Sequence, residues 1–261
     1  MLDYLDALTD KDWITRVLVC PECLIKLNFI ARRGGLECSR CGRTFSIRNG
    51  IPRFLSPPNE KREYLFEVER YNGIALNPPE SYDGLDESYP QRRTKLLKKY
   101  LDDVPYYLNI GQGFGQLEKA MGFKPKICLD QCFSFLEYCK GLDLPNTRYV
   151  AGFGERMPFD SDYFPAVVSD SVFQTLVDQR EFLIENARVL KPGGLFLLAM
   201  TYRWNYPRKP QDFPAHNPDL LCLFLKELGI GSTAIYIDLE NRVISDYEEG
   251  NYLLVVGKKN S

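Results

Sequence analysis

The stretch from Tyr106 to Gly115 reads YYLNIGQGFG and constrains the fold of this 261-residue chain more than any other. An apolar run typical of a buried strand ends at Gly111, Gly113 and Gly115, and a helix-like segment over 116–121 follows. Glycine permits positive φ and lets a ligand approach the backbone without a Cβ in the way. A strand, a glycine turn and a helix start are typical of a nucleotide site. The G-x-G-x-G spacing alone is also compatible with an ordinary turn, because dinucleotide sites use G-x-G-x-x-G.

A second short strand is predicted over 126–130, and it ends in an acid. Asp130 lies 15 residues after Gly115, about the length of one crossover helix plus a strand. We therefore expect Asp130 to return beside the glycine turn. A carboxylate at that place can hold both hydroxyls of a ribose, so the two features together predict a nucleoside site.

Two later segments carry a family resemblance. One reads Met157-Pro158-Phe159 and continues into 164–167, and the other, over 188–194, reads RVLKPGG. Together with the glycine turn and Asp130, they resemble class I S-adenosylmethionine-dependent methyltransferases of the methyltransferase type 11-like group, over about residues 96–200. The resemblance implies an α/β, Rossmann-like, doubly wound and mostly parallel sheet, with S-adenosylmethionine as cofactor.

The chain departs from the family pattern at two cofactor positions. The family usually has an acid before the glycines that helps to bind the methionine amino group, and here that position is Asn109. Many relatives have an Asp that accepts from the adenine amino group where this chain has Phe153, which can only pack on the ring. Losing one hydrogen bond costs on the order of 1 kcal/mol. These two residues leave open a degenerate, non-catalytic module.

The resemblance also implies the remaining site residues. Besides Asn109 and Phe153, the cofactor-binding candidates are Gly111, Gly113, Gly115, Asp130, Gln131, Gly154 and Asp170. Methyl transfer needs an aligned acceptor and, where required, a base. The candidate bases are Asp170, Tyr202, Asp212 and His216, the only histidine. A lone histidine in a proline-rich loop is more often incidental, so the base stays open.

Four N-terminal cysteines have the spacing of a metal site. Cys20 and Cys23 form one C-x2-C pair, Cys38 and Cys41 form another, and 14 residues separate the pairs. Two such knuckles close a tetrahedron around Zn²⁺. The set contains no histidine or carboxylate, so we expect a structural zinc; the alternative is four unpaired thiols. The ending over 45–55 resembles the zinc-ribbon domains that precede some methyltransferases of this type.

Charge is distributed unevenly along the chain. The net charge is −2, which gives no whole-chain bias toward nucleic acid, but residues 16–55 hold eight basic and two acidic residues. This basic ribbon is either an RNA footprint or a surface that docks onto an acidic partner domain.

Composition indicates a soluble globular protein, with 44% hydrophobic and 26% charged residues. No apolar run approaches the length of a membrane span, and the acidic N-terminus lacks the features of a signal peptide. We therefore predict a cytoplasmic protein. In that compartment the eight cysteines are expected as metal ligands and free thiols.

The predicted organisation has three parts. Residues 1–55 form an N-terminal arm and zinc ribbon, 56–91 a linker and cofactor lid with a short helix over 64–71 and a loop over 72–89, and 92–261 the methyltransferase domain. The predicted function is methyl transfer from S-adenosylmethionine to a small metabolite or sugar-containing biosynthetic intermediate. The alternatives are an RNA-base methyltransferase that uses the ribbon for RNA contact, and the non-catalytic module. No oligomeric state is predicted.

Overall fold

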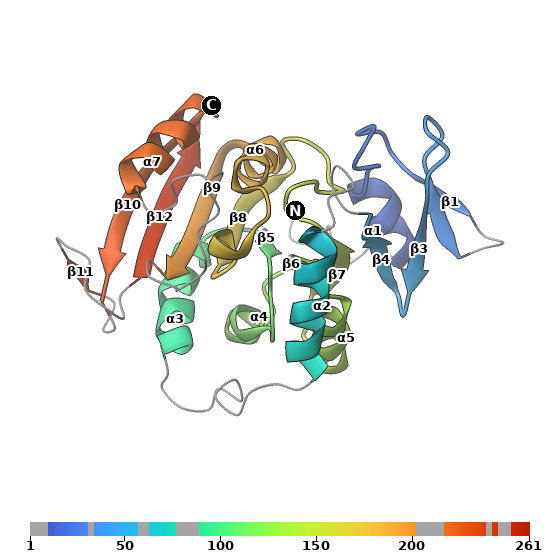
Figure 1. The fold of residues 1–261 in the computed structure, drawn as a ribbon, viewed down its shortest axis with the longest axis horizontal. Helices are drawn as coiled ribbons and strands as arrows, with labels where there is room; N and C mark the ends of the chain where they lie inside the picture. Colours follow the sequence, from blue (N-terminus) through green and yellow to red (C-terminus); the bar gives the residue numbers. More distant parts are fainter. Residues whose placement is uncertain are drawn as a thin grey trace.

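The computed structural model describes residues 10–30, 34–56, 63–76, 89–201, 217–238, 242–244 and 252–261. One sheet of 12 strands runs through these residues, in the order β1-β2-β3-β4-β7-β6-β5-β8-β9-β12-β10-β11. The N-terminal ribbon and the C-terminal strands occupy opposite ends of this sheet (Figure 1). None of the described helices is both long and apolar enough to cross a bilayer.

The centre of the sheet is parallel. Its strands are β5 (Tyr107–Ile110), β6 (Lys126–Asp130), β7 (Thr147–Gly152), β8 (Phe164–Asp170) and β9 (Leu190–Thr201). β5 pairs with β6 on one side and with β8 on the other, so the strand order reverses at β5. Ligands bind outside the carboxyl ends of the strands at such a switch point. The predicted Rossmann-like, doubly wound fold is confirmed.

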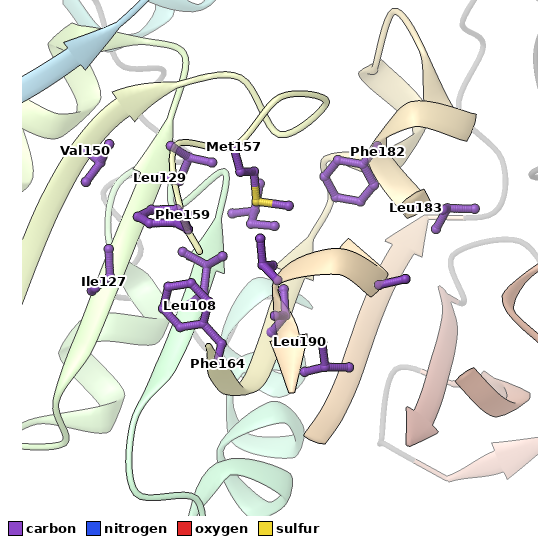
Figure 2. Close-up of a cluster of buried hydrophobic side chains, with 14 of the residues drawn as sticks. Leu108, Ile127, Leu129, Val150, Met157, Phe159, Phe164, Phe182, Leu183 and Leu190 are labelled. Atoms are coloured by element: carbon purple, nitrogen blue, oxygen red, sulfur yellow. The ribbon is translucent and has the colours of Figure 1, made fainter. Parts of the chain in front are cut away.

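Helices cover both faces of the central strands. They are α3 (Tyr89–Leu101), α4 (Gln116–Met121), α5 (Phe133–Gly141) and α6 (Gln179–Val189), with the short 3-10 helix η4 (Phe173–Thr175) before α6. Successive side chains of a strand point to opposite faces. Tyr107 accordingly packs with α3 and α4, whereas Leu108 packs in the cluster that holds Phe182 of α6. Figure 2 shows this second cluster, in which strand residues such as Leu129 gather beside Met157 and Phe159.

The C-terminal strands are antiparallel. After α7 (Pro218–Glu227) come β10 (Ile230–Ile237), β11 (Val243–Ile244) and β12 (Tyr252–Lys259), and β12 lies between β9 and β10. Asn217 caps α7, since its Oδ1 accepts from the backbone N–H groups of Asp219 and Leu220 at 3.1 and 3.2 Å.

The ribbon continues the same sheet. It comprises α1 (Asp10–Val17), β1 (Asn28–Ile30), β2 (Gly35–Glu37), β3 (Thr44–Arg48) and β4 (Ile51–Phe54). β4 pairs in parallel with β7, with Arg53 opposite Ala151 and Phe54 opposite Gly152. Trp13 and Phe54 of the ribbon share one buried cluster with Leu129 of the main sheet. The ribbon is therefore packed into the main core, and the boundaries 1–55, 56–91 and 92–261 stay a prediction.

The helix α2 (Glu63–Leu76) is longer than the predicted helix over 64–71. The predicted loop over 72–89 is therefore wrong for residues 72–76, and also for Tyr89, where α3 begins. The sequence Asn-Gly at 72–73 is typical of a turn, but Tyr71 and Ile74 pack against the cluster of Phe114 and Phe135, and this tertiary contact holds the helix. Residues 57–62 and 77–88 of the predicted linker and lid lie outside the described residues.

Candidate functional site

Glycine is required at the three positions of the turn for different structural reasons. All have positive φ, +73° at Gly111, +53° at Gly113 and +73° at Gly115. A Cβ on Gly111 would lie 2.1 Å from Cγ2 of Val172, and one on Gly115 would lie 2.9 Å from Sγ of Cys139. A Cβ on Gly113 meets no atom of the described residues within 4 Å. Gly111 and Gly115 thus serve protein packing, whereas Gly113 leaves open space for a ligand.

Asp130 lies beside this turn, at the carboxyl end of β6. Its Oδ1 accepts from the Cys132 backbone N–H at 2.8 Å, and its Oδ2 accepts from the Gly113 N–H at 3.3 Å. Burial raises the pKa of Asp130 to about 6, and the two backbone donors lower it in part. The carboxylate is therefore oriented at the place where a ribose would lie over the turn.

Two buried aromatic rings meet near the expected adenine position. Phe153 is buried, and its ring meets the ring of Tyr64 on α2 edge-on, with 5.1 Å between centroids. A Cβ on Gly154 would lie 2.8 Å from the ring of Phe182, so Gly154 allows close packing of that ring, and its cofactor role stays a prediction. Gln131 is half-buried directly after β6.

Helix α2 spans the carboxyl ends of β6 and β7. Tyr64 meets Phe153 near one end of the helix, and Asn72 lies near the other end. Oδ1 of Asn72 accepts from the Cys132 thiol at 3.1 Å and from the Ser134 backbone N–H at 3.4 Å. In Figure 1, α2 is cyan and runs beside α5. Its two ends therefore flank the Asp130 and Phe153 positions.

Two buried carboxylates were not predicted from the sequence, one beside the turn and one directly after Gly154. Glu118 on α4 has no exposed surface, and its Oε1 accepts from Nδ2 of Asn109 at 2.6 Å. Glu155 follows Gly154, and burial raises its pKa to about 7, although backbone N–H groups of Asp178 and Val177 oppose the shift. The signal for Glu118 was its three-residue spacing from Met121, which places it on the buried face of α4.

Asp170 is held by a guanidinium. Nε of Arg93 on α3 lies 3.0 Å from Oδ1 and 3.2 Å from Oδ2 of Asp170, and the Ser171 hydroxyl donates to Oδ1 at 3.0 Å. Only 7% of the Arg93 side chain is exposed. Both carboxylate oxygens of Asp170 therefore already contact hydrogen-bond donors of the protein. This geometry favours a positioning role for Asp170; Tyr202, Asp212 and His216 lie outside the described residues.

The four ribbon cysteines converge. Their sulfur atoms all lie within 4.8 Å of one another, and Sγ of Cys20 is 3.8 Å from Sγ of Cys41. Zn–S bonds of about 2.3 Å in a tetrahedron place sulfurs about 3.8 Å apart. The same backbone hydrogen bond closes each C-x2-C turn. The Leu24 N–H donates to the Cys20 carbonyl at 2.8 Å, and the Gly42 N–H donates to the Cys38 carbonyl at 2.9 Å. The site therefore fits a Zn²⁺ ion held by four thiolates.

At least four of the eight basic residues of the ribbon contact other groups of the protein, while Arg32 and Arg33 lie outside the described residues. Lys26 pairs with Asp160 of the main domain, and Arg43 pairs with Glu22 of the ribbon. The guanidinium carbons of Arg48 and Arg53 lie 5.3 and 4.8 Å from the ring centroid of Phe133. These contacts fit the docking interpretation of the basic ribbon better than the RNA footprint.

Family comparisons agree with this geometry. Residues 108–198 match the family model of the methyltransferase domain, and residues 14–50 match that of the Trm112p-like protein. The chain carries a methyltransferase domain. This domain contains the glycine turn, Asp130 and Phe153, and the Trm112p-like match contains the four cysteines. The resemblance in the sequence is thereby confirmed.

Curated relatives match only the methyltransferase part. The demethylmenaquinone methyltransferase of Chlorobaculum tepidum is 29% identical over 115 residues, 42% of this chain and 48% of that protein. The phthiotriol/phenolphthiotriol dimycocerosates methyltransferase of Mycobacterium tuberculosis is 33% identical over 86 residues, 33% of this chain and 30% of that protein. The chain thus spans half or less of the length of these relatives.

Solved structures share the fold. One is the complex between the Haloferax volcanii Trm112 methyltransferase activator and the putative methyltransferase. The match has a TM-score of 0.52 at 18% identity, and it covers 73% of this chain and 98% of the solved chain. At this identity the likeness establishes the fold alone.

Proposed function

We propose that this protein transfers a methyl group from S-adenosylmethionine to a small-molecule acceptor. The observation that carries the proposal is the pairing of Gly113 and Asp130 inside the methyltransferase domain. Gly113 leaves room for a ligand, and its N–H holds the carboxylate that would accept from the ribose. Other turn glycines, such as Gly122 and Gly193, have the same open space, but an ordinary glycine turn does not need a buried acid beside it.

The residues around the turn fit the parts of this cofactor. Asp130 would accept from the ribose hydroxyls, the aromatic pair Tyr64 and Phe153 would pack on the adenine, and Asn109 would face the methionine end. When bound, S-adenosylmethionine supplies a methyl group on a reactive sulfonium. The protein then needs to align the acceptor with that methyl. The Arg93–Asp170 pair fixes the end of β8 beside this place, so we assign to it positioning and not proton transfer.

We favour a small-molecule acceptor over RNA for two reasons. The two curated relatives described above are named for small-molecule acceptors. In addition, Lys26 pairs with Asp160 and Nε of Arg48 lies 3.9 Å from Oε1 of Glu137, and these acids of the main domain partly neutralise the ribbon charge available to a phosphate backbone. A sugar in the acceptor has no support among the described residues.

The Trm112p-like domain has a second role in this proposal. A Trm112 methyltransferase activator forms a complex with its putative methyltransferase in Haloferax volcanii. In this chain the corresponding domain is covalently attached, and β4 pairs with β7 up to Gly152, one residue before Phe153. We infer that the ribbon supports the cofactor site from within the same chain, with a structural zinc at Cys20, Cys23, Cys38 and Cys41.

Calorimetric titration of the full chain with S-adenosylmethionine tests the function. We expect saturable binding with one site per chain, and tight binding of S-adenosylhomocysteine to the same site. Absence of binding would leave the non-catalytic module as the function. A parallel titration with RNA at several salt concentrations separates the acceptors, since steeply salt-dependent RNA binding would favour the RNA-base methyltransferase.

A further inference from the structure

A buried hydrogen bond joins the two ends of the glycine turn. Asn109 precedes the glycines on β5, and Glu118 follows them on α4. Nδ2 of Asn109 donates to Oε1 of Glu118 at 2.6 Å, with 4% of Asn109 and 0% of Glu118 exposed. Charge-assisted hydrogen bonds are about twice as strong as neutral ones. The pair therefore fixes the orientation of both side chains beneath the turn.

The chemistry of the pair decides which atom of Asn109 is presented to a ligand. Oε1 of Glu118 accepts from Nδ2 of Asn109, so the amide nitrogen faces Glu118. The carbonyl oxygen then lies on the opposite side of the planar amide. Without the Glu118 carboxylate, the amide is free to turn and to present its N–H groups in place of that oxygen.

Strand order indicates which part of the cofactor lies near Asn109. Asp130 ends β6, and Phe153 follows its neighbour β7, so the ribose and the adenine extend from β6 toward β7. The rest of the cofactor must then extend in the opposite direction, over β5. That end carries the positively charged amino group. A cation near Asn109 is attracted by an amide oxygen and by a negative charge, and repelled by amide N–H groups.

Burial raises the pKa of Glu118, because no cation among the described residues compensates its charge at close range, and the amino group of a bound cofactor would oppose that shift. Lys126 on β6 is the nearby cation, but its ammonium donates to the carbonyls of Gly122, Lys124 and Pro145 at 2.6, 3.0 and 3.1 Å. Within the described ranges, no ion pair includes Glu118, and its Oε2 has no hydrogen-bond partner. Its other electrostatic neighbours are the thiols of Cys128 and Cys139, the phenol of Tyr107 and the carboxyl of Asp130.

We propose that Glu118 is a positioning residue of the cofactor site, which orients the Asn109 carbonyl oxygen toward the amino group of S-adenosylmethionine and supplies the negative charge that β5 lacks. The acid that the family pattern places on the strand has, in this chain, its counterpart on the following helix. This inference rests on the proposed function. It explains how Asn109, together with Glu118, can replace the acid that the family usually has before the glycines.

The Glu118→Gln variant tests the proposal with two ligands. S-adenosylmethionine carries the amino-acid end, whereas 5′-methylthioadenosine has the same nucleoside and thioether without it. We expect binding of S-adenosylmethionine to weaken about tenfold or more, the range for a hydrogen bond to a charged group. Binding of 5′-methylthioadenosine should stay within about twofold, a change of less than 0.5 kcal/mol. Equal weakening of both ligands, or no change in either, would overturn the proposal.

The double variant Asn109→Asp/Glu118→Gln provides a rescue. This variant places a carboxylate on β5 at position 109 and an amide on α4 at position 118. One carboxylate oxygen accepts from the amide, and the other stays available to the amino group of the ligand. We expect it to restore S-adenosylmethionine binding, whereas Asn109→Asp alone places two carboxylates at hydrogen-bond distance and lowers the thermal stability. Failure of the rescue in a folded double variant would also count against the proposal.

Two controls distinguish a failure of the Glu118 proposal from a failure of the proposed function. Glu185→Gln removes another largely buried carboxylate, which pairs with Arg188 at 2.6 Å away from the turn. It should lower the unfolding temperature without changing either affinity. A wild-type chain that binds 5′-methylthioadenosine and S-adenosylmethionine equally well refutes the role of Glu118, whereas one that binds neither refutes the proposed function itself.

Discussion

The guanidinium carbon of Arg53 lies 4.8 Å from the ring centroid of Phe133, and this contact joins the ribbon to the segment that presents Asp130. Arg53 belongs to β4, which pairs with β7. Phe133 begins α5, and the N–H of its neighbour Cys132 holds Oδ1 of Asp130 at 2.8 Å. A chain of direct contacts therefore runs from the ribbon to the expected ribose position.

Replacing Arg53 by Met should weaken this contact while keeping an unbranched side chain on β4. A cation–π contact contributes about 0.5–1 kcal/mol when exposed and about 2 kcal/mol when desolvated, and Nε of Arg53 is buried. We expect a lower unfolding temperature and severalfold weaker S-adenosylmethionine binding. Arg48→Met is the matched control, because its guanidinium lies farther from the same ring, at 5.3 Å, and 60% of its side chain is exposed. Equal effects of the two variants on affinity would contradict this account.

Removal of the zinc should loosen the ribbon and thereby weaken the contacts that join it to the Asp130 segment. The Cys38→Ser variant is expected to lose the metal, since three thiolates and a hydroxyl bind Zn²⁺ more weakly than four thiolates. The ribbon should loosen, while the main sheet keeps its circular dichroism. Metal analysis checks the loss, and Cys222→Ser, a half-buried thiol outside the cluster, should keep one zinc per chain. A folded wild-type preparation without zinc would rule out the structural metal.

Cofactor binding should depend on the ionisation of Asp130. Burial raises the pKa of Asp130 from 3.8 to about 6, so the free folded protein binds more protons than the unfolded chain between about pH 4 and pH 6. The contribution of Asp130 to stability is therefore present at low pH and is lost as the pH rises through 6. Ribose hydroxyls donate to the ionised form, so S-adenosylmethionine affinity should fall below about pH 6, by at most tenfold per pH unit.

The Asp130→Asn variant isolates this effect. At pH 8 the variant should bind S-adenosylmethionine more weakly than the wild type does. Below pH 6 its affinity should not show the fall that protonation of Asp130 causes in the wild type. Glu155, whose pKa burial raises to about 7, is unchanged in the variant, so the difference between the two calorimetric profiles reports on Asp130. Parallel profiles for wild type and variant would remove Asp130 from the ribose position.

Local sequence was sufficient to predict the parts of the fold that depend on backbone chemistry. Positive φ at Gly111, Gly113 and Gly115 and the convergence of the four cysteines both follow from short-range spacing. The position of Asp130 beside the turn follows from the length of one crossover unit. These features need few tertiary contacts, and for that reason they can be read from residue types alone.

Features that depend on tertiary packing could not be predicted in the same way. The Arg93–Asp170 pair joins residues 77 positions apart, and the helix over 72–76 exists because its apolar side chains meet Phe114 and Phe135. The spacing of Glu118 from Met121 indicates a buried position, but its contact with Asn109 emerges only when α4 is packed against β5. In each case the residue type is visible in the sequence, but the contact that determines its role comes from a distant segment.

Gly113 offers the most direct test of where a ligand lies. A Cβ there meets no atom of the described residues within 4 Å, so Gly113→Ala adds only the strain of a positive φ, roughly 1–2 kcal/mol. The new methyl group should protrude into the ligand space and weaken binding of both S-adenosylmethionine and 5′-methylthioadenosine more than tenfold, a loss above about 1.4 kcal/mol. Gly193→Ala is the control, because Gly193 has a φ of +73° and the same clearance from the described residues, but lies near the start of β9, away from the carboxyl ends of the parallel strands. It should lower the unfolding temperature by a similar amount and leave both affinities unchanged. If Gly113→Ala binds both ligands as tightly as the wild type, the cofactor does not lie against the turn.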